Sequence, residues 1–311
     1  MCIRDRYASP SIVRDGSVYH AYFPRQKIGG KVYNTPYATF TEDGSWTFKG
    51  EALPKLGAQA EGVVWAPGAA KTKDDRWMIY YTSDLVGTAS KKCIFRAQSR
   101  VPEGPFVDDY GGPIWCQPGT LWTIDAYLVQ DAQQNWHLSA RLDEPGGINT
   151  IKIRRLDPSG QFLAAGSAWI TQTKNAPDSW EQPVLENAGV VRLKPPTGEA
   201  HWFVFYSGRS YRDDSYAIGY ADCGASITGP CVKKTPNGPW LATKPGDDLY
   251  GPGTPTFYTN VAGKMMMSVE VLPHAGTKYD AANKGGYWMR TYEITVDDAY
   301  KPSVSLVRID K

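Results

Sequence analysis

The sequence has little net charge and no long apolar segment, and each absence excludes a class of protein. Its 311 residues carry 34 Lys and Arg against 32 Asp and Glu, a formal net charge of +2. The strongly basic surface expected of a nucleic-acid-binding or membrane-surface protein is therefore missing. No run of 18 or more apolar residues occurs, so no membrane-spanning helix is predicted. We expect neither a nucleic acid nor a membrane as partner.

Cysteine and histidine are also scarce, with five and four copies, and they lack zinc-site spacing such as C-x-x-C. We predict no catalytic metal and no cofactor, with a structural calcium ion as a minor alternative. Cys223 and Cys231 bracket a turn-rich segment, and Cys93 and Cys116 form a second candidate pair. Two disulfides and an oxidising compartment are predicted, and buried free thiols in a cytosolic protein remain the alternative.

The first six residues, MCIRDR, resemble translated adapter sequence and contain no apolar core of a signal peptide. We therefore treat residues 1–6 as a non-native start and residues 7–311 as a single domain. The native N-terminus, with any secretion signal, is expected upstream, and the predicted location is extracellular.

Aromatic and turn-forming residues are abundant, with 11 Trp, 19 Tyr, 31 Gly and 23 Pro, and they recur in one pattern. A short apolar segment ends in a small residue or Pro, and a strand, a polar turn and an aromatic strand follow. Copies occupy residues 7–23, 64–82, 123–140, 185–208 and 250–271, with Pro10, Pro67, Ala126, Ala188 and Gly253 as markers. The step of 57 to 65 residues has room for four short strands. Five ordered copies argue against chance and predict an all-β, five-bladed β-propeller.

The innermost strand of each blade lines the axis of a propeller, so equivalent residues of different copies converge there. The copies place at or near this position Ser9, Ala66, Asp125, Glu186 and Pro252. Two of the five are acids in apolar surroundings, where an ionised carboxylate is costly unless it is paired or used. Burial and mutual repulsion should push the pKa values of the two acids apart, as glycosidic-bond cleavage requires. A structural role, bonding backbone amides at blade ends, is the alternative.

Four motifs in chain order resemble glycoside hydrolase family 43, the five-bladed propeller enzymes that act on arabinan and xylan. They are ASPSIVRDG at residues 8–16, WAP at 65–67, IDA at 124–126 and ENA at 186–188, the last followed by the strands WFVFYSG and YAIGYA. The resemblance covers the chain from Tyr7 onward. It implies an inverting glycosidase, for which we expect an oligo- or polysaccharide substrate and a monomeric enzyme.

The resemblance also implies the roles of individual residues. Glu186 corresponds to the general acid, and Asp125 to the third carboxylate, which holds that acid and tunes its pKa. The general base of the family is a first-blade Asp, and Ser9 stands at its position here. Because a serine hydroxyl is a poor proton acceptor at pH 7, a glycan-binding relative that no longer cleaves is the alternative function.

Further candidates follow from position along the chain. Trp65 and Trp122 adjoin inner-strand residues and are the first choice for stacking on sugar rings, and Arg209 and Tyr211 are the second. The family's fifth blade commonly offers a His near the axis, and this chain has none there. Glu270 nearby is expected to face the surface; the alternative is that it points inward, where it could compensate electrostatically or bind a cation. Mid-strand positions predict a core role for Trp77, Tyr80 and Trp202.

The sequence argues against two other propeller functions. A protein-interaction propeller would have polar loops without buried acids, so Asp125 and Glu186 argue against it. A sucrose- or fructan-cleaving propeller would carry a nucleophilic Asp in the first blade, which this chain lacks.

Overall fold

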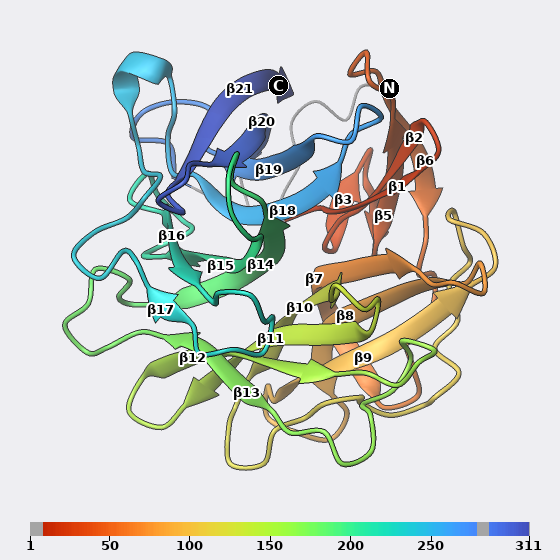
Figure 1. Ribbon diagram of the computed structural model, residues 1–311. Helices are drawn as coiled ribbons and strands as arrows, with labels where there is room; N and C mark the ends of the chain where they lie inside the picture. Colours follow the sequence, from red (N-terminus) through yellow and green to blue (C-terminus); the bar gives the residue numbers. More distant parts are fainter. Residues whose placement is uncertain (1–8, 279–285, 311) are drawn as a thin grey trace. The chain divides into compact units, whose positions relative to one another are not determined.

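The computed structural model, drawn in Figure 1, describes residues 9–278 and 286–310. These residues fall into two compact units. The first unit comprises Pro10–Gly146 and Lys152–Ile170, and the second comprises Ser9, Gly147–Ile151 and residues 171–310. The segment assigned above as a non-native start, residues 1–6, lies outside the described residues.

The first unit begins with two antiparallel sheets. The first sheet has the order β1-β2-β5-β6, with strands β1 (Ser11–Asp15), β2 (Val18–Tyr22), β5 (Pro36–Phe40) and β6 (Trp46–Glu51). A hairpin that the repeats did not predict, β3 (Gln26–Ile28) and β4 (Lys31–Tyr33), is inserted between β2 and β5. The second sheet has the order β7-β8-β9, with strands β7 (Ala60–Lys71), β8 (Trp77–Leu85) and β9 (Lys92–Ser99).

Three further sheets follow in chain order. The third contains β10 (Thr123–Gln130), β11 (Trp136–Glu144), β12 (Ile148–Arg155) and β13 (Ile170–Lys174). The fourth contains β14 (Leu185–Leu193), β15 (His201–Gly208), β16 (Ala217–Asp222) and β17 (Val232–Lys233). The fifth contains β18 (Gly253–Thr259), β19 (Met265–Val271), β20 (Trp288–Val296) and β21 (Pro302–Asp310). The last two sheets belong to the second unit.

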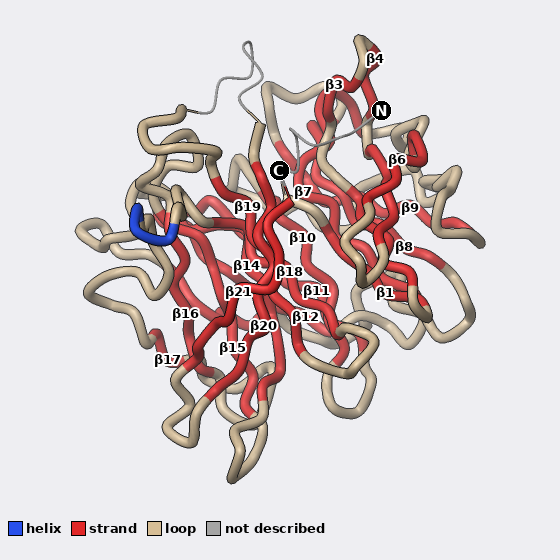
Figure 2. Tube along the Cα trace, turned by 90° about the horizontal axis from the view of Figure 1, so that it is seen from above, coloured by secondary structure: helices blue, strands red, loops and turns tan. Residues whose placement is uncertain are grey.

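The five consecutive sheets are the blades that the repeats predict, so the all-β, five-bladed β-propeller class is confirmed. Within residues 9–278 and 286–310 there is no α-helix, and the one helical turn is the short 3₁₀ segment Pro245–Asp247, blue in Figure 2. No helix in this described part is long and apolar enough to cross a membrane.

The blades are held together by aromatic strands whose side chains are buried on both faces. In β8, Trp77 is 2% exposed and Tyr80 is fully buried, and in β15 Trp202 is 4% exposed. The predicted core role of these three residues is confirmed. Both predicted cysteine pairings are also confirmed, Cys93 with Cys116 and Cys223 with Cys231.

A left-handed residue marks the inner strand of every blade. Positive φ angles occur at Ser9 (42°), Ala66 (33°), Asp125 (59°), Asn187 (48°) and Thr254 (50°), a conformation that non-glycine residues adopt rarely. In blades two to five the strand pairing shifts across this residue, as expected of a β-bulge.

These angles correct the predicted alignment of the copies. Ser9 and Asp125 are equivalent, as predicted, but Glu186 lies one residue before the left-handed position of its blade. In the fifth blade the prediction was wrong by two residues, because Thr254 and not Pro252 takes that position. The prediction chose the segment 251–253 because its small residues fit the repeat pattern. A β-branched residue such as Thr254 gives no sign in the sequence that its φ angle is positive.

Candidate active site

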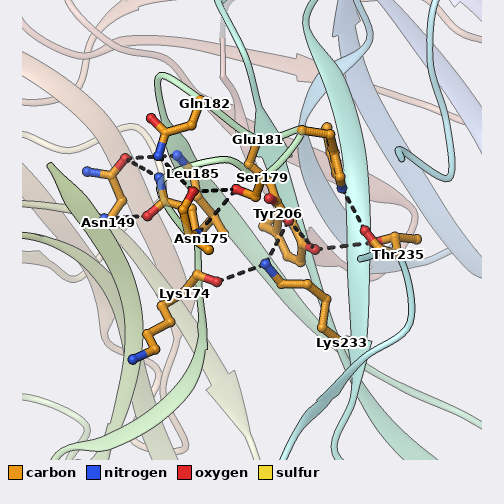
Figure 3. A network of polar contacts seen from close by, with 12 residues as sticks. Asn149, Lys174, Asn175, Ser179, Glu181, Gln182, Leu185, Tyr206, Lys233 and Thr235 are labelled. Carbon is orange, nitrogen blue, oxygen red and sulfur yellow. Dashed lines mark hydrogen bonds and ion pairs between the residues drawn. The ribbon is translucent and has the colours of Figure 1, made fainter. Parts of the chain in front are cut away.

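The backbone that carries Glu186 is fixed by a buried polar network in the second unit (Figure 3). Leu185, the first residue of β14, donates its N–H to Asn149 Oδ1 at 3.0 Å. Asn149 in turn donates its own N–H to Asn175 Oδ1 at 2.9 Å. The Asn149 side chain thus accepts the backbone N–H with which β14 begins, and the Asn175 side chain holds Asn149 in place. Glu186 is the next residue of β14.

The loop that leads into β14 is held by a buried ion pair. Glu181 is fully buried, and its Oε1 accepts hydrogen bonds from Lys233 Nζ at 2.7 Å and from Tyr206 OH at 3.2 Å. Figure 3 shows Lys233 also reaching the carbonyl oxygen of Lys174, at 2.8 Å. This contact links the loop to β17. Removing either partner would leave the charge of the other without compensation, which is costly in a buried site.

Glu186 is itself buried, with 8% of its surface exposed. Tyr216, which is fully buried, donates its hydroxyl to Glu186 Oε1 at 2.9 Å. Burial first, and then the charges of Glu186 and Glu270, raise the pKa of Tyr216 well above its usual value. The phenol therefore stays protonated at neutral pH and keeps its hydroxyl hydrogen for the bond to Glu186.

Gly253 makes room for this tyrosine. A Cβ atom on Gly253 would lie 1.9 Å from Tyr216 Cε1, far inside contact distance. The fifth blade therefore needs glycine at this position so that the Tyr216 ring can pack against its backbone and reach Glu186. In the register of the sheet, Gly253 is paired with Glu270.

The expectation that Glu270 faces the surface is wrong. The side chain is only 3% exposed, and the consecutive residues 266–271 of β19 are all buried, so both faces of this strand are covered. Glu270 Oε2 accepts the N–H of Ser9 at 2.9 Å and its hydroxyl at 3.3 Å. Burial raises the pKa of Glu270 to about 7, interactions with Ser9 and Thr254 oppose the rise, and the charge of Glu186 adds to it.

In the first unit, Asp125 occupies the left-handed position of β10. It is 7% exposed, between the buried apolar residues Ile124 and Ala126. Its N–H donates to Thr82 Oγ1 at 3.2 Å. The apolar surroundings predicted for this acid are therefore present, and the backbone at Asp125 is held by the neighbouring blade.

Trp65 and Trp122 are brought together. Their ring centroids lie 5.5 Å apart with planes at 84°, and both side chains are half-buried. Lys92 Nζ lies 4.0 Å from the Trp65 ring centroid, within cation–π distance. Two partly open indole rings beside a cation suit the binding of a sugar ring and its hydroxyls.

Comparison with known proteins decides the family. The model of glycosyl hydrolases family 43 matches residues 2–290. The chain belongs to glycosyl hydrolases family 43. No curated protein matches the sequence.

Solved structures of several polysaccharide-cleaving enzymes share the fold of this chain. A thermostable family-43 glycoside hydrolase has a TM-score of 0.78 at 19% identity, covering 97% of this chain and 93% of that one. An endo-1,4-β-xylanase from Bacteroides thetaiotaomicron scores 0.77 at 20% identity, covering 99% and 97%. The α-L-arabinanase of Cellvibrio cellulosa scores 0.72 at 17% identity, covering 98% and 96%. At these identities the likeness shows the fold alone.

The two second-choice sugar contacts of this family-43 chain differ in their surroundings. Arg209 donates from Nε to the Trp180 carbonyl oxygen at 3.2 Å, and its guanidinium lies 5.7 Å from the Trp180 ring. Tyr211 is 37% exposed, and Arg212 donates to its hydroxyl at 3.3 Å. Tyr211 is thus the more accessible of the two, whereas Arg209 is engaged with the loop that precedes β14.

The residues do not fit the metal that this fold class sometimes carries. Within residues 9–278 and 286–310, no group of three or more His, Cys, Asp or Glu side chains is placed to hold a metal ion. The fifth blade also lacks the histidine expected near its inner strand, since residues 251–255 read GPGTP. No step below involves a metal.

Proposed function

We propose that this chain hydrolyses O-glycosyl bonds in arabinan- or xylan-type polysaccharides with inversion at the anomeric carbon. The observation that carries the proposal is the buried carboxyl of Glu186, which accepts a hydrogen bond from a permanently protonated Tyr216. In the family this position holds the general acid. Neighbours of the same fold include an arabinanase, which has also been solved with arabinohexaose, and a xylan β-1,4-xylosidase.

In the proposed reaction Glu186 gives its proton to the glycosidic oxygen while the bond from that oxygen to the anomeric carbon breaks. A water molecule attacks the opposite face of the sugar and loses a proton to a base. Asp125 is assigned the role of the third carboxylate, which orients the acid. Trp65 and Trp122 are assigned to sugar stacking, with Tyr211 and Arg209 as secondary contacts.

We also propose that the protein acts outside the cell as a monomer without a cofactor. The two disulfides support an oxidising compartment. The polysaccharide substrates suggested by the neighbours are extracellular as well.

The test is release of arabinose or xylose from arabinan, arabinoxylan and the two matching p-nitrophenyl glycosides, with NMR of the anomer first formed. We expect Glu186→Gln to lower kcat by about 10²- to 10⁴-fold without loss of glycan affinity. Glu199→Gln makes the same change on an exposed side chain of the same unit and serves as control. Equal rates for Glu186→Gln and the wild type would contradict the assignment.

Ser9 favours the second candidate function, a glycan-binding propeller that no longer cleaves. On that alternative the wild type binds arabinan or xylan oligosaccharides but releases no sugar from any of them. Calorimetric titration with the same oligosaccharides separates the two functions, since a non-binding, inactive chain would contradict both.

A further inference from the structure

A carboxylate lies against the residue that stands where the family has its base. Ser9 is half-buried, and both its N–H and its hydroxyl are bonded to Glu270 Oε2. Glu270 comes from β19, the second strand of the fifth blade, so it lies 261 residues away in sequence. The first blade lacks an acid at this point, and the fifth blade supplies one.

The backbone contact alone does not require an acid. The N–H groups of the left-handed residues Asp125 and Thr254 are each bound by a residue on the second strand of the preceding blade. That residue is the one paired with the residue just before the preceding blade's own left-handed residue. In the second blade that residue is Thr82, paired with Trp65, and in the fourth it is Ser207, paired with Glu186. Thr82 binds Asp125 N–H at 3.2 Å and Ser207 binds Thr254 N–H at 2.8 Å. A hydroxyl is sufficient in both places.

In the fifth blade the same position, paired with Gly253, holds Glu270. A buried carboxylate is costly to ionise unless a cation compensates it. Among the described residues no Lys or Arg forms an ion pair with Glu270. The titratable groups that face it are Glu186 from β14 and Tyr216 from the segment before β16, and neither supplies a positive charge. Neither the backbone contact nor an ion pair therefore explains an acid at this position, whereas a role in proton transfer does.

We propose that Ser9 and Glu270 together supply the general base of the hydrolysis, with Glu270 as the final proton acceptor. The proposal rests on the proposed function. The attacking water gives a proton to Ser9 Oγ while the serine proton passes to Glu270 Oε2, and the water oxygen bonds to the anomeric carbon. The bond to the leaving oxygen breaks, and that oxygen takes the proton of Glu186. One turnover thus moves one proton from Glu186 to Glu270, and solvent returns it.

The pair makes a specific prediction about pH. The base works only when Glu270 is ionised, and its pKa is about 7. We expect kcat/KM of the wild type to rise with pH through the neutral range. A first-blade aspartate, by contrast, would give a rise several pH units lower, near the usual aspartate pKa of about 4.

The experiment compares four variants with the wild type on the substrate that it cleaves. Glu270→Gln keeps an oxygen for the Ser9 N–H, and Glu270→Ser copies the hydroxyl of the second and fourth blades. Both should fold and lose about 10²- to 10⁴-fold in kcat/KM. Azide should restore turnover in both, because it attacks without needing a base. Ser9→Ala should lose about 10²-fold. Ser9→Asp combined with Glu270→Gln should regain activity with the rising limb at lower pH.

The outcomes separate this proposal from the proposed function. Hydrolysis by Glu270→Gln at the wild-type rate, with an unchanged pH profile, would overturn the Ser9–Glu270 base and leave the glycosidase intact. A wild type without activity beside an active Ser9→Asp/Glu270→Gln variant would overturn the Ser9–Glu270 base and the proposed hydrolysis by this chain, and would leave the glycan-binding alternative. No sugar release by any variant would overturn both proposals. Thermal unfolding at pH 5 checks that the variants fold.

Discussion

Two buried glutamates of the second unit, Glu181 and Glu270, have almost the same exposure and opposite surroundings. Glu181 is fully buried with Lys233 at 2.7 Å and a tyrosine hydroxyl beside it. Glu270 is 3% exposed, and its carboxylate interacts with uncharged groups of Ser9 and Thr254. A charge-compensated carboxylate stabilises the fold in its ionised form. One without a cation is poised to gain and lose a proton near neutral pH.

The comparison shows that burial alone does not distinguish a structural acid from a chemical one. The distinguishing features are the charge of the partner and whether a neutral group does the same work in equivalent blades. The four predictions below test this distinction, beginning with the largest expected effect.

Replacing Glu181 by Leu should destabilise the protein by about 3 kcal/mol, because Lys233 is left without its partner in a mostly buried site. Urea unfolding at pH 7 measures the loss. The double variant Glu181→Leu/Lys233→Met should recover much of it. The shape of the pH–activity profile should not change. A profile that moves with Glu181 would contradict its assignment to the scaffold.

The stability of the wild type should fall as pH rises from about 4.5 to about 7. The folded pKa of Glu270, about 7, lies above the value of 4.5 in the unfolded chain, so the unfolded state binds fewer protons in this window. The contribution is on the order of 3 kcal/mol. Unfolding in urea at pH 5 and pH 8, for wild type and Glu270→Gln, measures it. Parallel changes in the two proteins would show that Glu270 does not titrate in this range.

Gly253→Ala should cost about 1–3 kcal/mol, since the added methyl group displaces the Tyr216 ring. The rate should fall as well, with kcat affected more than KM, because the donor to Glu186 moves. Gly238→Ala introduces the same methyl group where nothing lies within 4 Å and provides the control. If both variants lose equal activity, packing against Tyr216 is not the cause.

Two tyrosine variants give the smallest and most direct contrast. Tyr216→Phe removes the hydroxyl bonded to Glu186, and Tyr206→Phe removes the one bonded to Glu181. Each should cost about 1 kcal/mol of stability. Only Tyr216→Phe should also lower kcat, by about tenfold. An equal loss of rate in Tyr206→Phe would erase the distinction between the two glutamates.

The sequence was sufficient for the fold because the repeats carry the aromatic strands and turns of every blade. Disulfide pairing and the core tryptophans were predictable for the same reason, since both depend on local pattern. The hairpin β3–β4 was not predictable, because it is an insertion in one blade and so has no counterpart in the others.

The site was only partly predictable. Glu186 and Asp125 stand in motifs, but Glu270 follows Val269 in an ordinary strand, and its contact with Ser9 depends on register between strands. One signal was present. Thr82, Arg141, Ser207 and Glu270 all lie near the end of the second strand of their copies, and Glu270 is the one acid among these four.

The left-handed residue of each inner strand has a consequence for how such sites change over time. In Ser9, Asp125 and Thr254 the backbone N–H is bound by a side chain of a neighbouring strand, so the direction in which the residue's own side chain leaves the backbone does not depend on what that side chain is. Ser9, Asp125 and Thr254 all occupy this left-handed backbone position in one molecule. The reactive side chain can therefore be exchanged in evolution, or moved to an adjoining strand, while the backbone that carries it stays the same.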